Sequence, residues 1–183
     1  MVELRLVPAV TPAPPGDGAC LTAFERELDY VFATLRRLGA APHEVEDLAQ
    51  ELFVVLYRQW DTLDQSRPLR PYLFGIALRI VGAQRRRRVR EVPSPDLEVT
   101  GDVADPEHML QGKQAVELLL AALEAVPLPR RAVVIMHDLD QTPIVDVARQ
   151  LSISRFGAYA RLRQGRRELA AAVRRLVRRG ATR

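Results

Sequence analysis

Apolar residues recur at three- and four-residue intervals along most of the chain, which is the period of an amphipathic helix. The pattern predicts one helix over residues 20–38, which Gly39 ends, and a second over residues 42–60. A third helix begins near Pro71, after a polar loop over residues 61–70, and continues into the arginine run at residues 85–88. We expect these helices to form one small bundle around their apolar stripes, which are Leu21, Phe24, Leu28, Val31, Phe32 and Leu35, then Val45, Leu48, Leu52, Val55 and Leu56, then Leu73, Ile76, Ala77, Ile80 and Val81.

A second helical unit follows residues 91–106, a segment with three prolines and little periodicity that is typical of a linker. Helices are predicted over residues 107–125, 129–138, 142–150 and 155–178. The proline-rich residues 1–19 are predicted to form a disordered tail. The predicted fold is therefore all-α, with two small helical bundles, residues 20–90 and 107–179, joined by a flexible acidic linker.

The composition is that of an ordinary folded protein, because 48% of the 183 residues are hydrophobic and 27% are charged. No segment approaches the ~20 apolar residues that a membrane-spanning helix needs. The first residues lack the basic region and the apolar core of a secretory signal. We therefore expect a cytoplasmic protein with no direct membrane insertion.

The sequence predicts no metal site. Cys20 is the only cysteine, which excludes an intramolecular disulfide and a zinc site built on several thiolates. His43, His108 and His137 lie on different predicted elements and have no metal-ligand spacing.

Enzymatic activity is also not predicted, since the chain has neither a glycine-rich phosphate loop nor a nucleophile elbow. Asp138, Asp140 and Asp146 could form a carboxylate cluster, but they lie at a predicted turn and helix start, where aspartate commonly acts as a cap. We expect no cofactor and no small-molecule substrate.

Charge is distributed unevenly along the chain. Residues 21–65 contain nine acidic and four basic residues, and residues 79–90 contain six arginines and no acid. Residues 91–107 contain six acids and no base, and residues 155–183 contain ten arginines and one acid. Two basic blocks separated by an acidic connector indicate two surfaces that bind a polyanion, most simply one nucleic acid.

Residues 142–169 have the pattern of a helix-turn-helix. Val147, Leu151, Ile153 and Leu162 would face inward, with Ala148 where the two helices touch. Two residues weaken the match: Ser152 occupies a turn position that usually requires glycine, and Gly157 lies inside the second helix. At ~100° per residue, the outward face falls within a sector of about 80°. It consists of Arg155, Tyr159, Arg163 and Arg166, which predicts DNA contact, the alternative being a solvated arginine face in an ordinary bundle.

Two further faces belong to the first bundle. Asp47, Gln50, Glu51 and Val54 share one side of the second helix, with Glu44 near its start, and indicate docking of a basic protein partner rather than a merely solvated surface. Arg79, Arg86 and Arg90 align on the third helix, which begins with the aromatic residues Tyr72 and Phe74. Aromatic rings beside an arginine stripe favour unstacked nucleic acid, although Phe74 itself is expected in the core.

At these places the sequence resembles the extracytoplasmic-function (group IV) sigma factors of bacterial RNA polymerase. EDLAQELF at residues 46–53 is similar to their region-two signature, and PYLFGIALRI at residues 71–80 is similar to their Trp-Leu-x-x-Ile-Ala-x-Asn segment. Residues 105–141 resemble the linker exit and the opening of region four. The resemblance covers most of residues 21–177.

The resemblance implies a two-domain transcription initiation factor that binds core RNA polymerase, directs it to specific promoters and melts the minus-ten element. It also implies an anti-sigma partner. Asp47, Gln50 and Glu51 would dock on the core enzyme. The minus-ten element would be captured by Arg67, Arg70, Tyr72, Arg79, Arg85, Arg86 and Arg90, and the minus-thirty-five element would be bound by Arg155, Tyr159, Arg161, Arg163 and Arg166.

The sequence departs from the family pattern at three places. Tyr72 stands where tryptophan is usual, and Arg79 stands where asparagine is usual. The usual Gly-Thr-Val-Lys-Ser-Arg-Leu of the last helix becomes Phe-Gly-Ala-Tyr-Ala-Arg-Leu at residues 156–162. This change predicts reduced or unusual minus-thirty-five specificity.

Two other functions fit parts of the pattern. A stand-alone helix-turn-helix regulator would bind palindromic duplex DNA as a dimer, but it would leave the acidic face without a role. If the protein is instead a protein-binding adaptor, the arginine blocks are solvated faces, and little salt-dependent affinity for DNA is expected.

Overall fold

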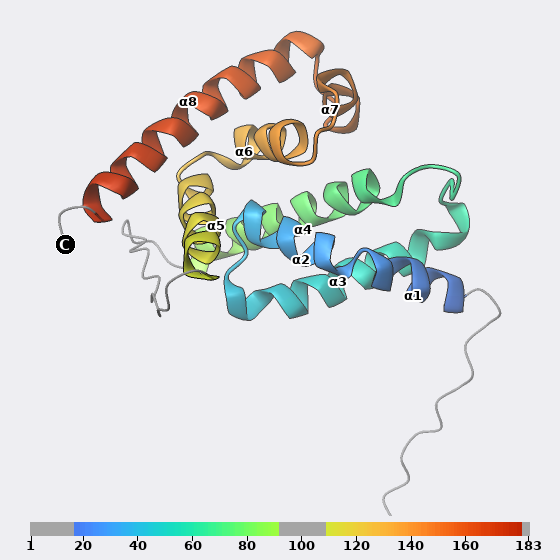
Figure 1. Ribbon diagram of the computed structural model, residues 1–183. Helices are drawn as coiled ribbons and strands as arrows, with labels where there is room; N and C mark the ends of the chain where they lie inside the picture. Colours follow the sequence, from blue (N-terminus) through green and yellow to red (C-terminus); the bar gives the residue numbers. More distant parts are fainter. Residues whose placement is uncertain (1–16, 92–108, 181–183) are drawn as a thin grey trace, which may run out of the picture.

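The computed structural model describes residues 17–91 and 109–180, and each element in these two ranges is a helix (Figure 1). The N-terminal half contains α1 (Asp17–Arg26), α2 (Leu28–Leu38), α3 (Val45–Gln59) and α4 (Leu69–Glu91), with short 3-10 turns at Pro42–Glu44 and Trp60–Thr62. The C-terminal half contains α5 (Met109–Glu124), α6 (Leu128–Val134), a π-helical segment (Ile135–Leu139), α7 (Ile144–Gln150) and α8 (Arg155–Gly180). The all-α prediction is confirmed, while the predictions for residues 1–16 and 92–106 lie outside the described residues.

The helix predicted over residues 20–38 is two helices, and that part of the prediction is wrong. Glu27 has φ −106° and ψ 7°, outside helical values, and its N–H donates to the Phe24 carbonyl at 3.0 Å in a tight turn. Helix α1 begins at Asp17, so residues 17–19 are helical rather than part of a tail. Cys20 and Phe24 are buried, whereas Leu21 is 46% exposed and does not join the apolar stripe.

Helices α2, α3 and α4 pack around one core, as their apolar spacing predicts. Most of the predicted stripe is buried: Val31, Leu35, Val45, Leu48, Leu52, Leu56, Leu73, Ile76, Ala77, Ile80 and Val81. Gly39 ends α2 with φ +102°, and its N–H donates to the carbonyls of Leu35 and Arg36. Only glycine adopts this left-handed conformation without strain, so the predicted stop at Gly39 is confirmed.

In the C-terminal half, α8 packs against α5, α6 and α7. The helix predicted over residues 129–138 instead changes to a π-helical segment at Ile135, where the Asp140 N–H donates to the Ile135 carbonyl at 2.9 Å. Gly165 lets α8 approach α6 closely, because a Cβ added there would lie 2.7 Å from the Val134 Cγ2.

The two halves are in direct contact. Helices α5 and α6 pack against α2, and buried residues of both halves belong to one core cluster (Figure 1). Arg131 lies fully buried at this boundary, where its guanidinium donates to the carbonyls of Leu38 at 2.7 Å, Glu124 at 2.7 Å and Val126 at 3.1 Å. Burial and the neighbouring charge of Arg85 lower the pKa of Arg131 to about 10.

Candidate nucleic-acid and protein interfaces

Helix α3 presents a continuous acidic and apolar face to solvent. Asp47, Gln50, Glu51 and Val54 are all exposed, as their spacing predicts, while Leu48 and Leu52 on the opposite side are buried. Within the described residues, Asp47 and Glu51 form no ion pair. Two free carboxylates beside an exposed valine make a surface suited to a basic partner.

Glu44 has a different role from the one its position predicts. Its carboxylate accepts hydrogen bonds from the Ala41 N–H at 3.0 Å and from Gln84 at 2.6 Å, and it pairs with Arg88. Glu44 therefore links the C-terminal part of α4 to the start of α3 and does not belong to the acidic face formed by Asp47 and Glu51.

The basic residues of α4 lie along most of its length. Arg67 pairs with Asp64 at 2.8 Å, and Arg79 and Arg86 are exposed. Tyr72 is half-buried at the first turn and donates its hydroxyl to Gln59, whereas Phe74 is buried as expected. The side chain of Arg90 lies outside the described residues.

Arg85 does not lie with Arg79 and Arg86. It is half-buried, close to Gly39 and Arg131 at the boundary between the halves. The i, i+7 pair of Arg79 and Arg86 shares one face of α4, and Arg85 projects from another.

The helix-turn-helix has the predicted geometry. After α7, the Ser152 N–H donates to the Arg149 carbonyl at 3.2 Å and the Ile153 N–H to the Ala148 carbonyl at 3.0 Å, the two bonds of a Schellman motif. Ser152 has φ +52°, the left-handed conformation that the turn requires. Ser154 then caps α8, since its hydroxyl accepts the Gly157 N–H at 3.0 Å. Gly157 thus lies in the first turn of α8 rather than in its interior.

The first two turns of α8 are basic and aromatic on their outer side. Arg155, Phe156, Tyr159 and Arg163 are exposed and Arg161 is half-buried, while Ala158 and Leu162 face the core. Among the described residues, Arg155, Arg161 and Arg163 form no ion pair, and Arg166 pairs with Asp138 through two hydrogen bonds. The predicted DNA face therefore exists as a surface, with Arg166 already bound to a carboxylate.

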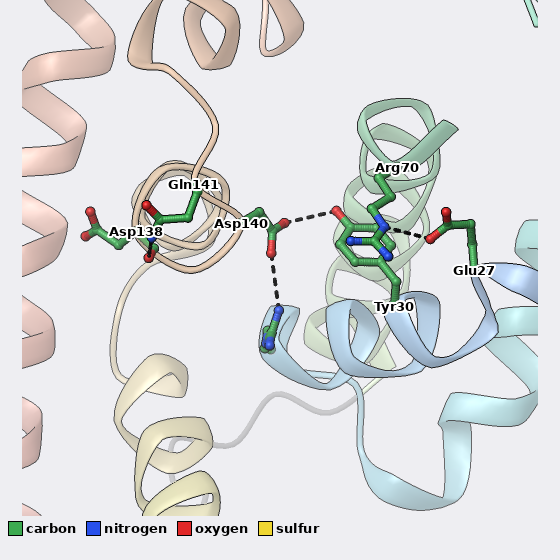
Figure 2. A network of polar contacts seen from close by, with 7 residues as sticks. Glu27, Tyr30, Arg70, Asp138, Asp140 and Gln141 are labelled. Carbon is green, nitrogen blue, oxygen red and sulfur yellow. Dashed lines mark hydrogen bonds and ion pairs between the residues drawn. The ribbon is translucent and has the colours of Figure 1, made fainter. Parts of the chain in front are cut away.

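Each of the three aspartates interpreted as caps instead pairs with an arginine. Asp138 binds Arg166 at 2.5 Å on α8, Asp146 binds Arg149 at 2.8 Å, and Asp140 binds Arg37 at 3.2 Å on α2. No side-chain cap is formed at the start of α7. The predicted turn and helix start are present, since Asp146 lies in the first turn of α7, but the predicted side-chain caps are not, and the π-helical segment directs Asp138 towards α8 and Asp140 towards α2 (Figure 2).

Asp140 also joins a polar network across the boundary that sequence analysis missed (Figure 2). The Tyr30 hydroxyl donates to Asp140 at 2.9 Å, and the Arg70 guanidinium lies 5.1 Å above the Tyr30 ring while it pairs with Glu27 at 2.7 Å. Burial raises the pKa of Asp140 despite the Tyr30 hydrogen bond and the Arg37 charge. Burial, and then the Asp140 charge, raise the pKa of Tyr30 well above its ordinary value.

Beside this network, a cleft of roughly 580 Å³ lies between α2, the start of α4 and the π-helical segment with the loop that follows it. Its lining includes Arg70 and Pro71 of α4, Met136, and Gln150, whose amide donates to the Pro71 carbonyl. Within residues 17–91 and 109–180, no three histidine, cysteine or carboxylate side chains are placed to hold a metal ion. None of the helices described combines the length and apolar character needed to cross a bilayer.

Comparison with known proteins assigns both halves to the same family. Residues 23–91 match the family model for sigma-70 region 2, and residues 116–169 match the model for sigma-70 region 4. The chain is 26% identical over 142 residues to the RNA polymerase sigma factor NccH of Alcaligenes xylosoxydans xylosoxydans, covering 74% of this chain and 76% of the relative. It is 25% identical over 162 residues to the ECF RNA polymerase sigma factor SigE of Mycolicibacterium smegmatis, covering 84% of this chain and 63% of the relative.

The fold is also that of a solved sigma factor. The sigma factor RpoE of Bartonella quintana, crystallised with the anti-sigma factor NepR, matches with a TM-score of 0.61 at 17% identity, over 88% of this chain and 98% of RpoE. The two helical bundles and their order along the chain are therefore shared with that protein.

Proposed function

This chain belongs to the sigma-70 family and, within it, to the extracytoplasmic-function sigma factors, which are transcription initiation factors, and we propose that it binds core RNA polymerase and directs it to specific promoters. The observation that best supports this proposal is the pairing of two unlike surfaces in one chain. The free carboxylates of Asp47 and Glu51 on α3 lie in the part that matches region 2, and the unpaired Arg155, Arg161 and Arg163 of α8 lie in the part that matches region 4.

The acidic face of α3 is the proposed docking site for core polymerase. Asp47, Gln50 and Glu51 are exposed beside Val54, which is 44% exposed, so a partner can bury apolar area while it pairs with the carboxylates. The test is a titration of labelled protein with purified core enzyme, using the wild type and the D47R/E51R double variant.

A matched control changes the net charge equally at another surface. Glu25 on α1 and Asp61 are also exposed acids, so E25R/D61R has the same net charge as D47R/E51R. We expect D47R/E51R to abolish binding and E25R/D61R to leave it nearly unchanged. Equal losses in both variants would show a long-range charge effect and overturn the docking site.

The titration also separates the proposed function from its two competitors. If the wild type does not bind core enzyme but binds duplex DNA with an affinity that falls steeply between about 50 and 200 mM salt, the chain is a stand-alone regulator. Binding to neither core enzyme nor DNA leaves a protein-binding adaptor.

The N-terminal half is further proposed to melt the minus-ten element. Arg67 lies just before α4, Arg70 and Tyr72 lie in its first turn, and Arg79 and Arg86 lie along its exposed side. Arg85 and Arg90 complete the proposed set. Capture of unstacked bases on an aromatic ring contributes about 1–3 kcal/mol per base, which can drive opening without hydrolysis. No catalytic step is therefore required.

Melting can be measured with 2-aminopurine placed in the minus-ten element of a promoter bound by the reconstituted holoenzyme. Y72A is expected to reduce the fluorescence rise strongly, whereas Y72F, which keeps the ring and loses only the hydroxyl bond to Gln59, is expected to preserve it. Equal losses in Y72A and Y72F would assign Tyr72 a structural role through Gln59 instead.

The exposed face of α8 is the proposed minus-thirty-five surface, through Arg155, Tyr159, Arg161, Arg163 and Arg166. An anti-sigma factor is the proposed regulator, by analogy with RpoE and NepR, and the cytoplasm is the proposed location. Footprinting of the holoenzyme on a promoter tests the DNA contact, and copurification from the source bacterium tests the partner.

A further inference from the structure

Phe156 is the most exposed large apolar side chain among the described residues. It is 84% exposed, whereas the other large exposed apolar side chains among the described residues range from 40% to 54%. Full burial of such a side chain would contribute roughly 1.5–3 kcal/mol to stability, and the fold obtains little of this from Phe156. The fold therefore does not account for an aromatic residue at this position.

The position of Phe156 is fixed by the turn that precedes it. Ser152 in the left-handed conformation and the Ser154 cap set the direction in which α8 begins, and Phe156 is the second residue of that helix. At ~100° per residue, Arg155, Phe156, Tyr159 and Arg163 fall within a sector of about 100°, and Phe156 lies at the edge of this sector that is farthest from the buried Ala158 and Leu162.

The charges around Phe156 favour a polyanionic partner. Arg155 and Arg163 form no ion pair within the described residues. The nearest acid on the helix, Glu168, is bound to Arg130 at 2.9 Å. A ring flanked by free guanidinium groups, at the N-terminal end of the second helix of a helix-turn-helix, occupies the part that enters the DNA major groove.

We infer that Phe156 contacts the C5-methyl group of a thymine in the upstream promoter element and selects that base. The thymine methyl is the one apolar group that a base pair presents in the major groove, and phenylalanine is among the side chains that contact it. This inference rests on the proposed function. It assigns Phe156 a specificity role in addition to the residues already placed on the minus-thirty-five surface.

The test compares thymine with uracil, which lacks only the C5-methyl group. A duplex library with a randomised upstream element is prepared once with thymidine and once with deoxyuridine, and holoenzyme selects from each. Wild type, F156A and F156L are compared, with V177A as the control, because Val177 is 53% exposed near the far end of the same helix. Urea unfolding checks that each variant is folded.

We expect wild type and V177A to enrich thymine at one position of the thymidine library. In the deoxyuridine library, both should lose this preference, which one methyl group sets at about fourfold. F156A should lack the preference in both libraries, and F156L should retain part of it. Identical motifs from the two libraries with wild type, or an equal loss of binding by F156A on both, would overturn the inference. If wild-type holoenzyme enriches no sequence beyond core enzyme alone, the proposed function itself fails.

Discussion

The Tyr30 hydroxyl donates a hydrogen bond to the Asp140 carboxylate at 2.9 Å, which joins residues 110 positions apart across the boundary between the two halves. Arg37 pairs with the same carboxylate at 3.2 Å, and the Asp140 side chain is 13% exposed. Burial raises the pKa of both Tyr30 and Asp140, so the low-polarity surroundings disfavour negative charge on either side chain. The contact therefore joins the two halves through a hydrogen bond and an ion pair at a site where burial opposes negative charge.

A double-mutant cycle on Tyr30 and Asp140 measures this contact. D140A leaves the Tyr30 hydroxyl without its acceptor and should lower the free energy of unfolding by about 1–3 kcal/mol, while Y30F should cost about 1 kcal/mol. The coupling energy from urea unfolding of the single and double variants should be at least about 0.5 kcal/mol. Strictly additive effects would mean that the two groups do not interact in solution.

Stability should depend on pH through Asp140. Its pKa is raised in the folded protein from the ordinary value of 3.8, so the folded state binds more protons than the unfolded state between these two values. The stabilisation that comes from protonation of Asp140 is fully present below about pH 3.8 and is lost as the pH rises through the raised pKa of the folded state. The free energy of unfolding of wild type should therefore fall relative to that of D140N as the pH rises from about 4 towards neutrality. A rise over the same pH range would contradict the raised pKa of Asp140.

Replacing Arg131 should have the largest effect on stability. In R131M three carbonyls lose their donor; those of Leu38 and Val126 are in buried hydrogen bonds and that of Glu124 is in a partly buried one, and each buried unsatisfied group costs about 1–3 kcal/mol. We expect a total loss of about 3 kcal/mol or more, measured by urea unfolding. R130M is the matched control, because Arg130 is partly exposed and its ion pair with Glu168 contributes at most about 1 kcal/mol.

The helices and the helix-turn-helix were predictable because apolar periodicity and turn chemistry are local. The burial of Leu52, Ile76 and Leu162 follows from spacing alone, whereas Ser152, which weakened the match in the sequence, adopts the left-handed conformation that the turn requires. The break at Glu27 was not predictable, since no glycine or proline marks it and the apolar period continues through it.

The boundary between the halves was not predictable for a different reason. Arg131 follows Arg130, and two adjacent arginines are expected to be exposed to solvent. Its burial depends on carbonyls of α2 and of the loop after α5. Asp140 finds Tyr30 and Arg37 only because the π-helical segment turns it towards α2. The contacts of Asp140 and the bond from Arg131 to Leu38 join residues about a hundred positions apart, so no local pattern encodes them. The faces of α3 and α8 lie on single helices and could be predicted as surfaces, whereas Glu44 and Arg166 could not be recognised as already paired.

Substituting Ser152 by glycine should stabilise the helix-turn-helix. Ser152 has φ +52°, a conformation that costs a non-glycine residue about 1–2 kcal/mol. Glycine removes this strain but increases the entropy of the unfolded chain, so the expected net gain for S152G is about 0.5–1 kcal/mol in urea unfolding at fixed pH. S154A serves as the opposite control two residues later, because it removes the cap on the Gly157 N–H and should cost about 1 kcal/mol. A loss of stability in S152G would mean that the turn before α8 does not adopt the left-handed conformation, and the direction given to Phe156 would then no longer hold.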